Sequence, residues 1–160
     1  MMKKAKKFLE VSKQQSETVA GLAVPELRQG EATMYNIFAL RGIRVDRIEP
    51  GLVVCTFKVP LRLLDRNGKF ASGAIANLVD VVGSCVIFVS GAPMNVTVEM
   101  SISYLSTAKL NDELEITSRL LGQKGGYSGT IVLMRNKVTG EIISEGRHSL
   151  FRSRRVYGKL

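Results

Sequence analysis

The sequence predicts an α+β domain in which one long helix is wrapped by a curved antiparallel β-sheet. Three observations support this fold class: a long apolar segment near the middle of the chain, strand-like runs on both sides of it, and short turns between neighbouring runs. Turns this short can join only antiparallel neighbours. At 160 residues and 45% hydrophobic residues, the chain has the size and composition of a single domain with a substantial core.

The first part of the chain, residues 3–30, has helix-like spacing of apolar residues such as Phe8 and Leu22, up to Pro25. We therefore predict a helix there. The predicted organisation is an N-terminal helical extension over residues 1–30, the main domain over residues 31–151 and a basic tail over residues 152–160.

The strand-like runs begin with a hairpin in which the Pro50-Gly51 turn separates Ile43–Ile48 from Val53–Val59. Further runs follow the central apolar segment, and the last of them comes after a Thr139-Gly140 turn. They read MNVTVEMSISYLS, DELEITSRLLGQ, YSGTIVLMRNKV and EIISEGRHSLFRS. Apolar residues alternate within these runs, which is typical of strands with one buried face.

The central segment extends from Gly73 to about Ser90 and contains many valines, which favour a strand. Its length favours a helix, because strands usually have ~5–6 residues. Ser72 could cap its start, and Gly91 with Pro93 could end it. A helix that is apolar nearly all round should be buried, so we predict a core helix.

Asp80 is the single acid in this apolar segment. An ionised carboxylate among apolar residues is costly unless it is paired or hydrogen-bonded. Two interpretations follow: Asp80 is a structural acceptor for a backbone group, or it is a general base or nucleophile that faces a pocket.

The formal net charge of +9 is concentrated at the two ends of the chain. Residues 1–9 carry four lysines and residues 147–160 carry five basic side chains, without an acid in either stretch. Such ends could bind nucleic acid, an anionic membrane or a phosphorylated ligand, or could serve solubility alone. Nucleic acid is disfavoured because interleaved aromatic residues and a known binding motif are lacking, and neither a membrane span nor a signal peptide is predicted.

The two cysteines, Cys55 and Cys85, lie in apolar runs and are predicted to be reduced core residues of an intracellular protein. The final Gly-Lys-Leu is one residue away from the peroxisomal Ser-Lys-Leu signal. The expected location is the cytoplasm, with the peroxisome as the alternative.

Three strings together resemble the small hotdog-fold acyl-CoA thioesterases: ASGAIANLVD, GAPMNVTVEMSISYLSTAKLNDELEI and TGEIISEGRHSLF. The branch they resemble includes phenylacetyl-CoA thioesterases and thioesterase superfamily member two, and the similarity covers about residues 35–151. The resemblance implies a hotdog fold, two active sites per homodimer and often a homotetramer built as a dimer of dimers. It also implies hydrolysis of an acyl-CoA substrate to a free acid and CoA, without a metal or redox cofactor.

In that family the acid at the position of Asp80 carries out the chemistry, and a Ser at the position of Thr97 orients the attacking water. Thr97 is equally well explained as a good strand residue. Backbone N–H groups at a helix start can stabilise the oxyanion of a thioester reaction, which points to Ser72 and Gly73, although an ordinary helix start is the equal alternative. Because Asp80 is eight residues from Ser72, or ~12 Å along a helix, one carbonyl could use both only if they come from different chains. This predicts a site at a dimer interface.

The chain departs from the family pattern at two positions. Relatives often have His-Gly-Gly where this chain has Ala71 followed by Ser and Gly, and an Asn where this chain has Asp65. Asn67 lies two residues further on and could fill the same polar role. A hotdog module that binds acyl-CoA or a protein partner without catalysis is therefore the alternative to a thioesterase.

His148 is the single histidine and is predicted to be an ordinary strand residue, because no Ser or Cys lies in a nucleophile-elbow pattern and no metal-ligand spacing is present. The basic tail would suit the phosphates of CoA, because arginines make bidentate phosphate contacts. The candidate phosphate ligands are Arg152, Arg154, Arg155 and, in the predicted GQKGGYSG turn, Lys124.

Overall fold

The computed structural model describes residues 9–22, 33–89 and 96–152, and the chain divides into two compact units, Met1–Ile37 and Phe38–Leu160. In the first unit, helix α2 (Lys13–Ala20) lies within the segment for which a helix is predicted. It begins with a capping box, in which the Gln15 N–H donates to Ser12 Oγ at 3.2 Å and the Ser12 N–H donates to Gln15 Oε1 at 2.8 Å. These bonds satisfy two of the N–H groups that a helix start leaves without partners.

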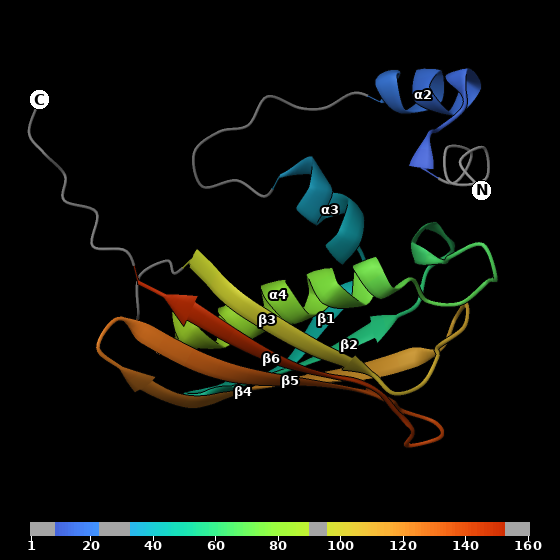
Figure 1. Ribbon diagram of the computed structural model, residues 1–160. Helices are drawn as coiled ribbons and strands as arrows, with labels where there is room; N and C mark the ends of the chain where they lie inside the picture. Colours follow the sequence, from blue (N-terminus) through green and yellow to red (C-terminus); the bar gives the residue numbers. More distant parts are fainter. Residues whose placement is uncertain (1–8, 23–32, 90–95, 153–160) are drawn as a thin grey trace, which may run out of the picture. The chain divides into compact units, whose positions relative to one another are not determined.

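The second unit is built on a six-stranded antiparallel sheet, and Figure 1 shows it curving along one side of helix α4 (Ser72–Val89). The strand order is β1-β2-β4-β5-β6-β3. The strands are β1 (Ile43–Glu49), β2 (Leu52–Lys58), β3 (Val96–Tyr104), β4 (Glu113–Lys124), β5 (Tyr127–Asn136) and β6 (Ile142–Phe151). The predicted hairpin, the later strands and the long helix are therefore confirmed. The remaining elements are α3 (Met34–Leu40), which spans the boundary between the units, and the 3-10 turn η1 (Leu61–Leu63).

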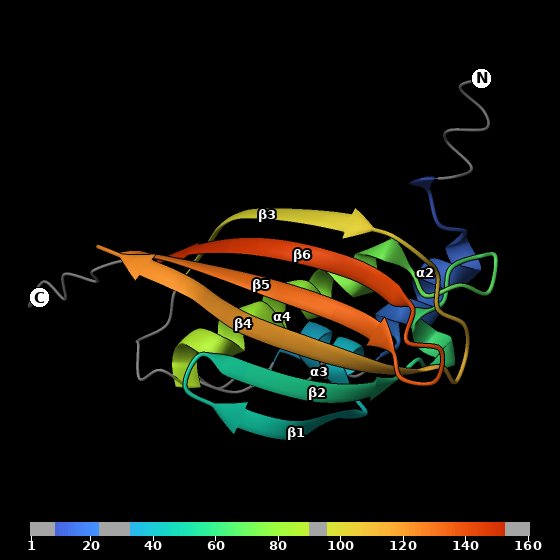
Figure 2. The ribbon, with the colours of Figure 1, turned by 90° about the horizontal axis from the view of Figure 1, so that it is seen from below.

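Helix α4 covers the concave face of the sheet, as the turned view in Figure 2 also shows. Its buried residues pack against the inward-facing side chains of β2, β4, β5 and β6, and these side chains form the core. The buried positions of α4 are Ile75, Asn77, Leu78, Val79, Val82, Gly83, Val86 and Ile87. Within the described residues α4 is the one helix long and apolar enough to cross a membrane, but these packing contacts identify it as the core helix of the domain.

Glycine allows helix and sheet to approach closely in this core. A Cβ at Gly146 of β6 would lie 2.5 Å from Val79 Cγ1 of α4, which is closer than carbon atoms can pack. Any larger residue at this position would have to displace the Val79 side chain or the helix that carries it.

The start of α4 differs from the prediction in one detail. Ser72 is the first helical residue rather than the cap, and the carbonyl of Ala71 accepts the N–H groups of Ala74 and Ile75 at 3.0 and 3.1 Å. The hydrogen bonds that begin the helix therefore start one residue earlier than predicted.

The two edge strands of the sheet differ in their chemistry. Strand β1 carries four charged residues among seven, whereas β3 carries a single charged residue, Glu99, among nine. Strand β3 also exposes apolar side chains, with Val96 56% and Val98 54% exposed. Charged residues protect an edge strand from further pairing, so β1 is protected and β3 is not.

Candidate active site

Three side chains meet where α4 passes strands β3 and β6: Asp80, Thr97 and His148. The Thr97 hydroxyl donates to Asp80 Oδ1 at 2.7 Å. His148 Nε2 lies 3.0 Å from Thr97 Oγ1 and 3.4 Å from Asp80 Oδ1. The pairing of β3 with β6 brings the threonine and the histidine to the same inner face, next to the helix that carries the acid.

The direction of these hydrogen bonds assigns the tautomer of His148. Because the Thr97 hydroxyl gives its proton to Asp80, its oxygen accepts from His148, and the imidazole proton is therefore on Nε2. Nδ1 is buried and has no hydrogen-bond partner in the described part of the chain. Burial lowers the pKa of His148 below its ordinary value, and the nearby Asp80 carboxylate only partly opposes this effect. His148 is thus a neutral hydrogen-bond donor.

The lowered pKa of His148 predicts how stability responds to pH. The unfolded chain gains a proton on this histidine as the pH falls through about 6.5, while the folded chain remains neutral, so the free energy of unfolding should fall by at most about 1.4 kcal/mol per pH unit. We expect this loss to set in below about pH 7 and to continue until the pH reaches the lowered pKa of the folded histidine, in denaturant titrations at fixed protein concentration, with a flatter dependence in the His148→Gln variant. Equal slopes in both proteins would contradict a neutral buried histidine.

Asp80 lies on the open side of α4 rather than within the core. Its side chain is 42% exposed, while that of His148 is fully buried. Both contacts to the acid are made with Oδ1, and in the described residues Oδ2 has no partner. One carboxylate oxygen is therefore held in place and the other is open to solvent or to a ligand.

The start of α4 presents the second part of the candidate site, the backbone N–H groups that could bind an oxyanion. Ser72 and Gly73 are both exposed, and the first N–H groups of a helix have no partner within it. The Tyr104 hydroxyl, at the end of β3, donates to the Ser72 carbonyl at 3.3 Å. The arrangement leaves two adjacent donors at the positive end of the helix dipole.

The loop before α4 shows how Asp65 and Asn67 are placed. Asp65 Oδ1 accepts the N–H groups of Lys69 at 2.9 Å and of Asn67 at 2.8 Å, so this carboxylate closes its own turn. These bonds hold the pKa of Asp65 below its ordinary value, with the bond from Lys69 as the largest cause. Asn67 is exposed in the same loop.

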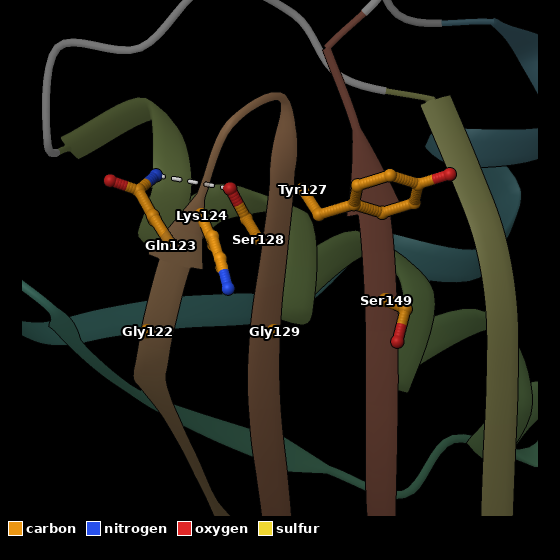
Figure 3. A pocket seen from close by; sticks show the side chains of 7 residues that line it. All are labelled: Gly122, Gln123, Lys124, Tyr127, Ser128, Gly129 and Ser149. Carbon is orange, nitrogen blue, oxygen red and sulfur yellow. Dashed lines mark hydrogen bonds between the residues drawn. The ribbon is translucent and has the colours of Figure 1, made fainter.

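A shallow pocket of about 380 Å³ lies at the turn between β4 and β5 (Figure 3). Lys124 and Tyr127 project from this hairpin, and Ser149 of β6 forms another part of the lining. The Arg152 N–H donates to the Gly126 carbonyl at 2.8 Å, which places Arg152 beside the same turn. Two of the predicted phosphate ligands, Lys124 and Arg152, therefore share one end of the sheet; Arg154 and Arg155 lie outside the described residues.

Sequence reasoning identified Asp80 and Thr97 as candidates but treated His148 as an ordinary strand residue. A signal for its position was present in the sequence, because residues two apart on a strand share a face and His148 is two residues before the apolar Leu150, which is buried in the structure. Across residues 9–22, 33–89 and 96–152, no three His, Cys, Asp or Glu side chains gather as they would around a metal ion.

Of the two cysteines, Cys55 is buried, which raises the pKa of its thiol to about 11, and Cys85 is half-buried.

Comparison with known proteins agrees with this fold. Residues 67–126 match the thioesterase superfamily. Acyl-coenzyme A thioesterase 13 of Homo sapiens is 37% identical over 102 residues, which are 62% of this chain and 72% of that protein.

Solved structures with the same fold include zebrafish thioesterase superfamily member 2, with a TM-score of 0.69, 34% identity and coverage of 72% of this chain and 84% of that one. A hypothetical thioesterase of Streptococcus pneumoniae, crystallised with coenzyme A, has a TM-score of 0.67 at 26% identity and covers 69% of this chain and 88% of that one. Together with the long helix on a six-stranded antiparallel sheet, these similarities show that the chain belongs to the thioesterase superfamily, a family of thioester hydrolases with the hotdog fold.

Proposed function

We propose that the protein hydrolyses acyl-CoA thioesters to a free acid and CoA, with Asp80 as the general base. The observation that carries this proposal is the hydrogen-bonded chain from His148 through Thr97 to Asp80, which fixes one oxygen of an accessible carboxylate. The substrate class is supported by the relatives, one of which is an acyl-coenzyme A thioesterase and another of which was crystallised with coenzyme A.

In the proposed reaction, Asp80 Oδ2 takes a proton from a water molecule as the water oxygen attacks the thioester carbonyl. The resulting oxyanion accepts hydrogen bonds from the N–H groups of Ser72 and Gly73, which the helix dipole polarises. When the tetrahedral intermediate collapses, the carbon–sulfur bond breaks and the CoA thiolate takes the proton from Asp80. Thr97 and His148 hold the carboxylate in the orientation that this transfer requires.

We further propose that each site is shared by two copies of the chain. The separation of ~12 Å along α4 prevents Asp80 and the Ser72–Gly73 donors of one chain from reaching the same carbonyl. Pairing of the exposed, largely uncharged β3 strand with a second copy would extend the sheet and bring the two α4 helices side by side. In that arrangement the acid of one chain would face the helix start of the other.

The rival function is a hotdog module that binds acyl-CoA without hydrolysing it. Its support is Ala71, which lacks the imidazole that many relatives carry at that position. Asp65 supports it less, because this carboxylate already accepts two backbone N–H groups of its own turn.

The test is release of free CoA from a panel of short, long and aromatic acyl-CoAs. We expect saturable hydrolysis of at least one class. Saturable binding without hydrolysis would favour the rival function.

The same assay tests the proposed phosphate contacts. Replacing Lys124 and Arg152 together by Ala should raise KM for an acyl-CoA by about tenfold, equivalent to about 1.4 kcal/mol of lost binding. Hydrolysis of the acyl N-acetylcysteamine thioester, which lacks the nucleotide, should change little. The charge-matched control is Lys58→Ala combined with Arg135→Ala. These two residues lie at the end of the sheet away from the β4–β5 turn. Equal losses on both substrates would exclude phosphate recognition at this end of the sheet.

A further inference from the structure

We infer that Gly83 is a positioning residue for the reaction, because its missing side chain lets α4 hold the imidazole of His148 against Thr97. This inference rests on the proposed function. Gly83 lies three residues after Asp80, so the acid and the glycine are neighbours on the helix surface. The same turn of α4 would thus supply the base and fix the imidazole on which its orientation depends.

The first observation is the space that Gly83 leaves. A Cβ at this position would lie 2.8 Å from His148 Nδ1, 3.3 Å from Thr130 Oγ1 and 3.3 Å from Val132 Cγ2. His148 is 1% exposed and Thr130 is 1% exposed, so the ring has no solvent-filled space to move into. An added methyl group would therefore have to displace the ring, the helix or both.

The second observation is that His148 Nδ1 is buried without a hydrogen-bond partner in the described chain. Nδ1 faces the helix at Gly83 and makes no hydrogen bond with the described residues. A proton on Nδ1 would be unsatisfied there, whereas a proton on Nε2 reaches Thr97 Oγ1 at 3.0 Å. The close approach at Gly83 thus favours the one tautomer that supports the Thr97–Asp80 hydrogen bond.

Gly146 provides a contrast within the same helix–sheet contact. A Cβ there would meet the apolar Val79 at 2.5 Å and would not meet His148 within its three nearest contacts. Both glycines permit close packing, but Gly83 alone of the two faces a group of the candidate active site. Gly146→Ala is therefore the matched control for a purely packing role.

The experiment compares Gly83→Ala with Gly146→Ala in the full-length protein. For Gly83→Ala we expect kcat to fall at least about tenfold while KM stays within about twofold, because the ring moves but the substrate contacts remain. His148 is the single histidine, so its ring nitrogen and proton NMR signals can be followed without overlap from another imidazole. In Gly83→Ala the chemical shifts of these signals should depart from those of an imidazole protonated on Nε2, whereas in Gly146→Ala they should keep those values. This difference should hold even if the two substitutions lower Tm by similar amounts.

A second comparison repeats Gly83→Ala in a His148→Ala background. There the added methyl group should enter the space that the imidazole vacates, so Tm should rise rather than fall, and kcat should show no further loss. If Gly83→Ala alone fails to fold, the double variant should still fold, and failure of both would overturn the inference. An unchanged His148 signal in Gly83→Ala, or equal effects of the substitution in both backgrounds, would also overturn it. The NMR and Tm results do not require turnover, so they decide the role of Gly83 even if the wild type hydrolyses no tested thioester.

Discussion

Replacing Asp80 by Asn should lower kcat for acyl-CoA hydrolysis by about 10²–10⁴-fold, the range typical for loss of a general base. Asn keeps the size of the side chain and an oxygen that can accept from Thr97 at the position of Oδ1. It cannot take a proton from water at the other position. The substitution therefore removes the proposed proton transfer while it retains the hydrogen bond that orients the side chain.

The measurement is thiol release under saturating substrate, with circular dichroism and Tm as checks on the fold. Glu99→Gln is the control, because it neutralises an exposed acid that lies outside α4. Glu99 is on β3, the strand that carries Thr97. Its kcat should stay close to that of the wild type. Retention of wild-type kcat in Asp80→Asn would remove Asp80 from the mechanism and leave only its structural interpretation.

Replacing Val98 by Lys should convert a dimer or larger oligomer into a monomer and reduce activity by more than about 100-fold at micromolar concentration, because the oxyanion donors would be lost with the partner chain. Val98 is 54% exposed on β3, and a lysine there would place a positive charge from each chain at the proposed β3 interface. The wild type should have a mass at least twice that of the 17.6 kDa chain in light scattering.

The control for this variant is Val45→Lys, the same substitution at a 50% exposed position of the other edge strand, β1. It should change neither the mass nor the activity. A wild-type protein that is monomeric at micromolar concentration and still hydrolyses acyl-CoA would exclude the two-chain site.

The fold was predictable because its signals are local. Segment length separated the central helix from a strand, and alternating apolar residues with short turns identified the sheet strands. The helix start was misplaced by one residue, because the carbonyl of Ala71 makes the first bonds although Ser72 is the better capping residue type.

The site was only partly predictable because it depends on distances between elements. Asp80 could be recognised as an acid in an apolar helix, and Thr97 through the resemblance. The position of His148 beside Thr97 depends on the register of β3 with β6 and on how closely α4 approaches the sheet at Gly83. Neither quantity follows from residue types alone, since a shift of one residue in register would turn the histidine to the other face.

The difference between the two sheet edges has a consequence for how far assembly can proceed. If two copies join through β3 by a two-fold axis, both β3 edges are consumed and the combined sheet ends in β1 on each side. Each terminal strand then presents the charged side chains of Arg44, Asp46, Arg47 and Glu49 to solvent. Addition of a third chain along the sheet would bury these charges, so the pairing closes at two copies and does not propagate into a filament.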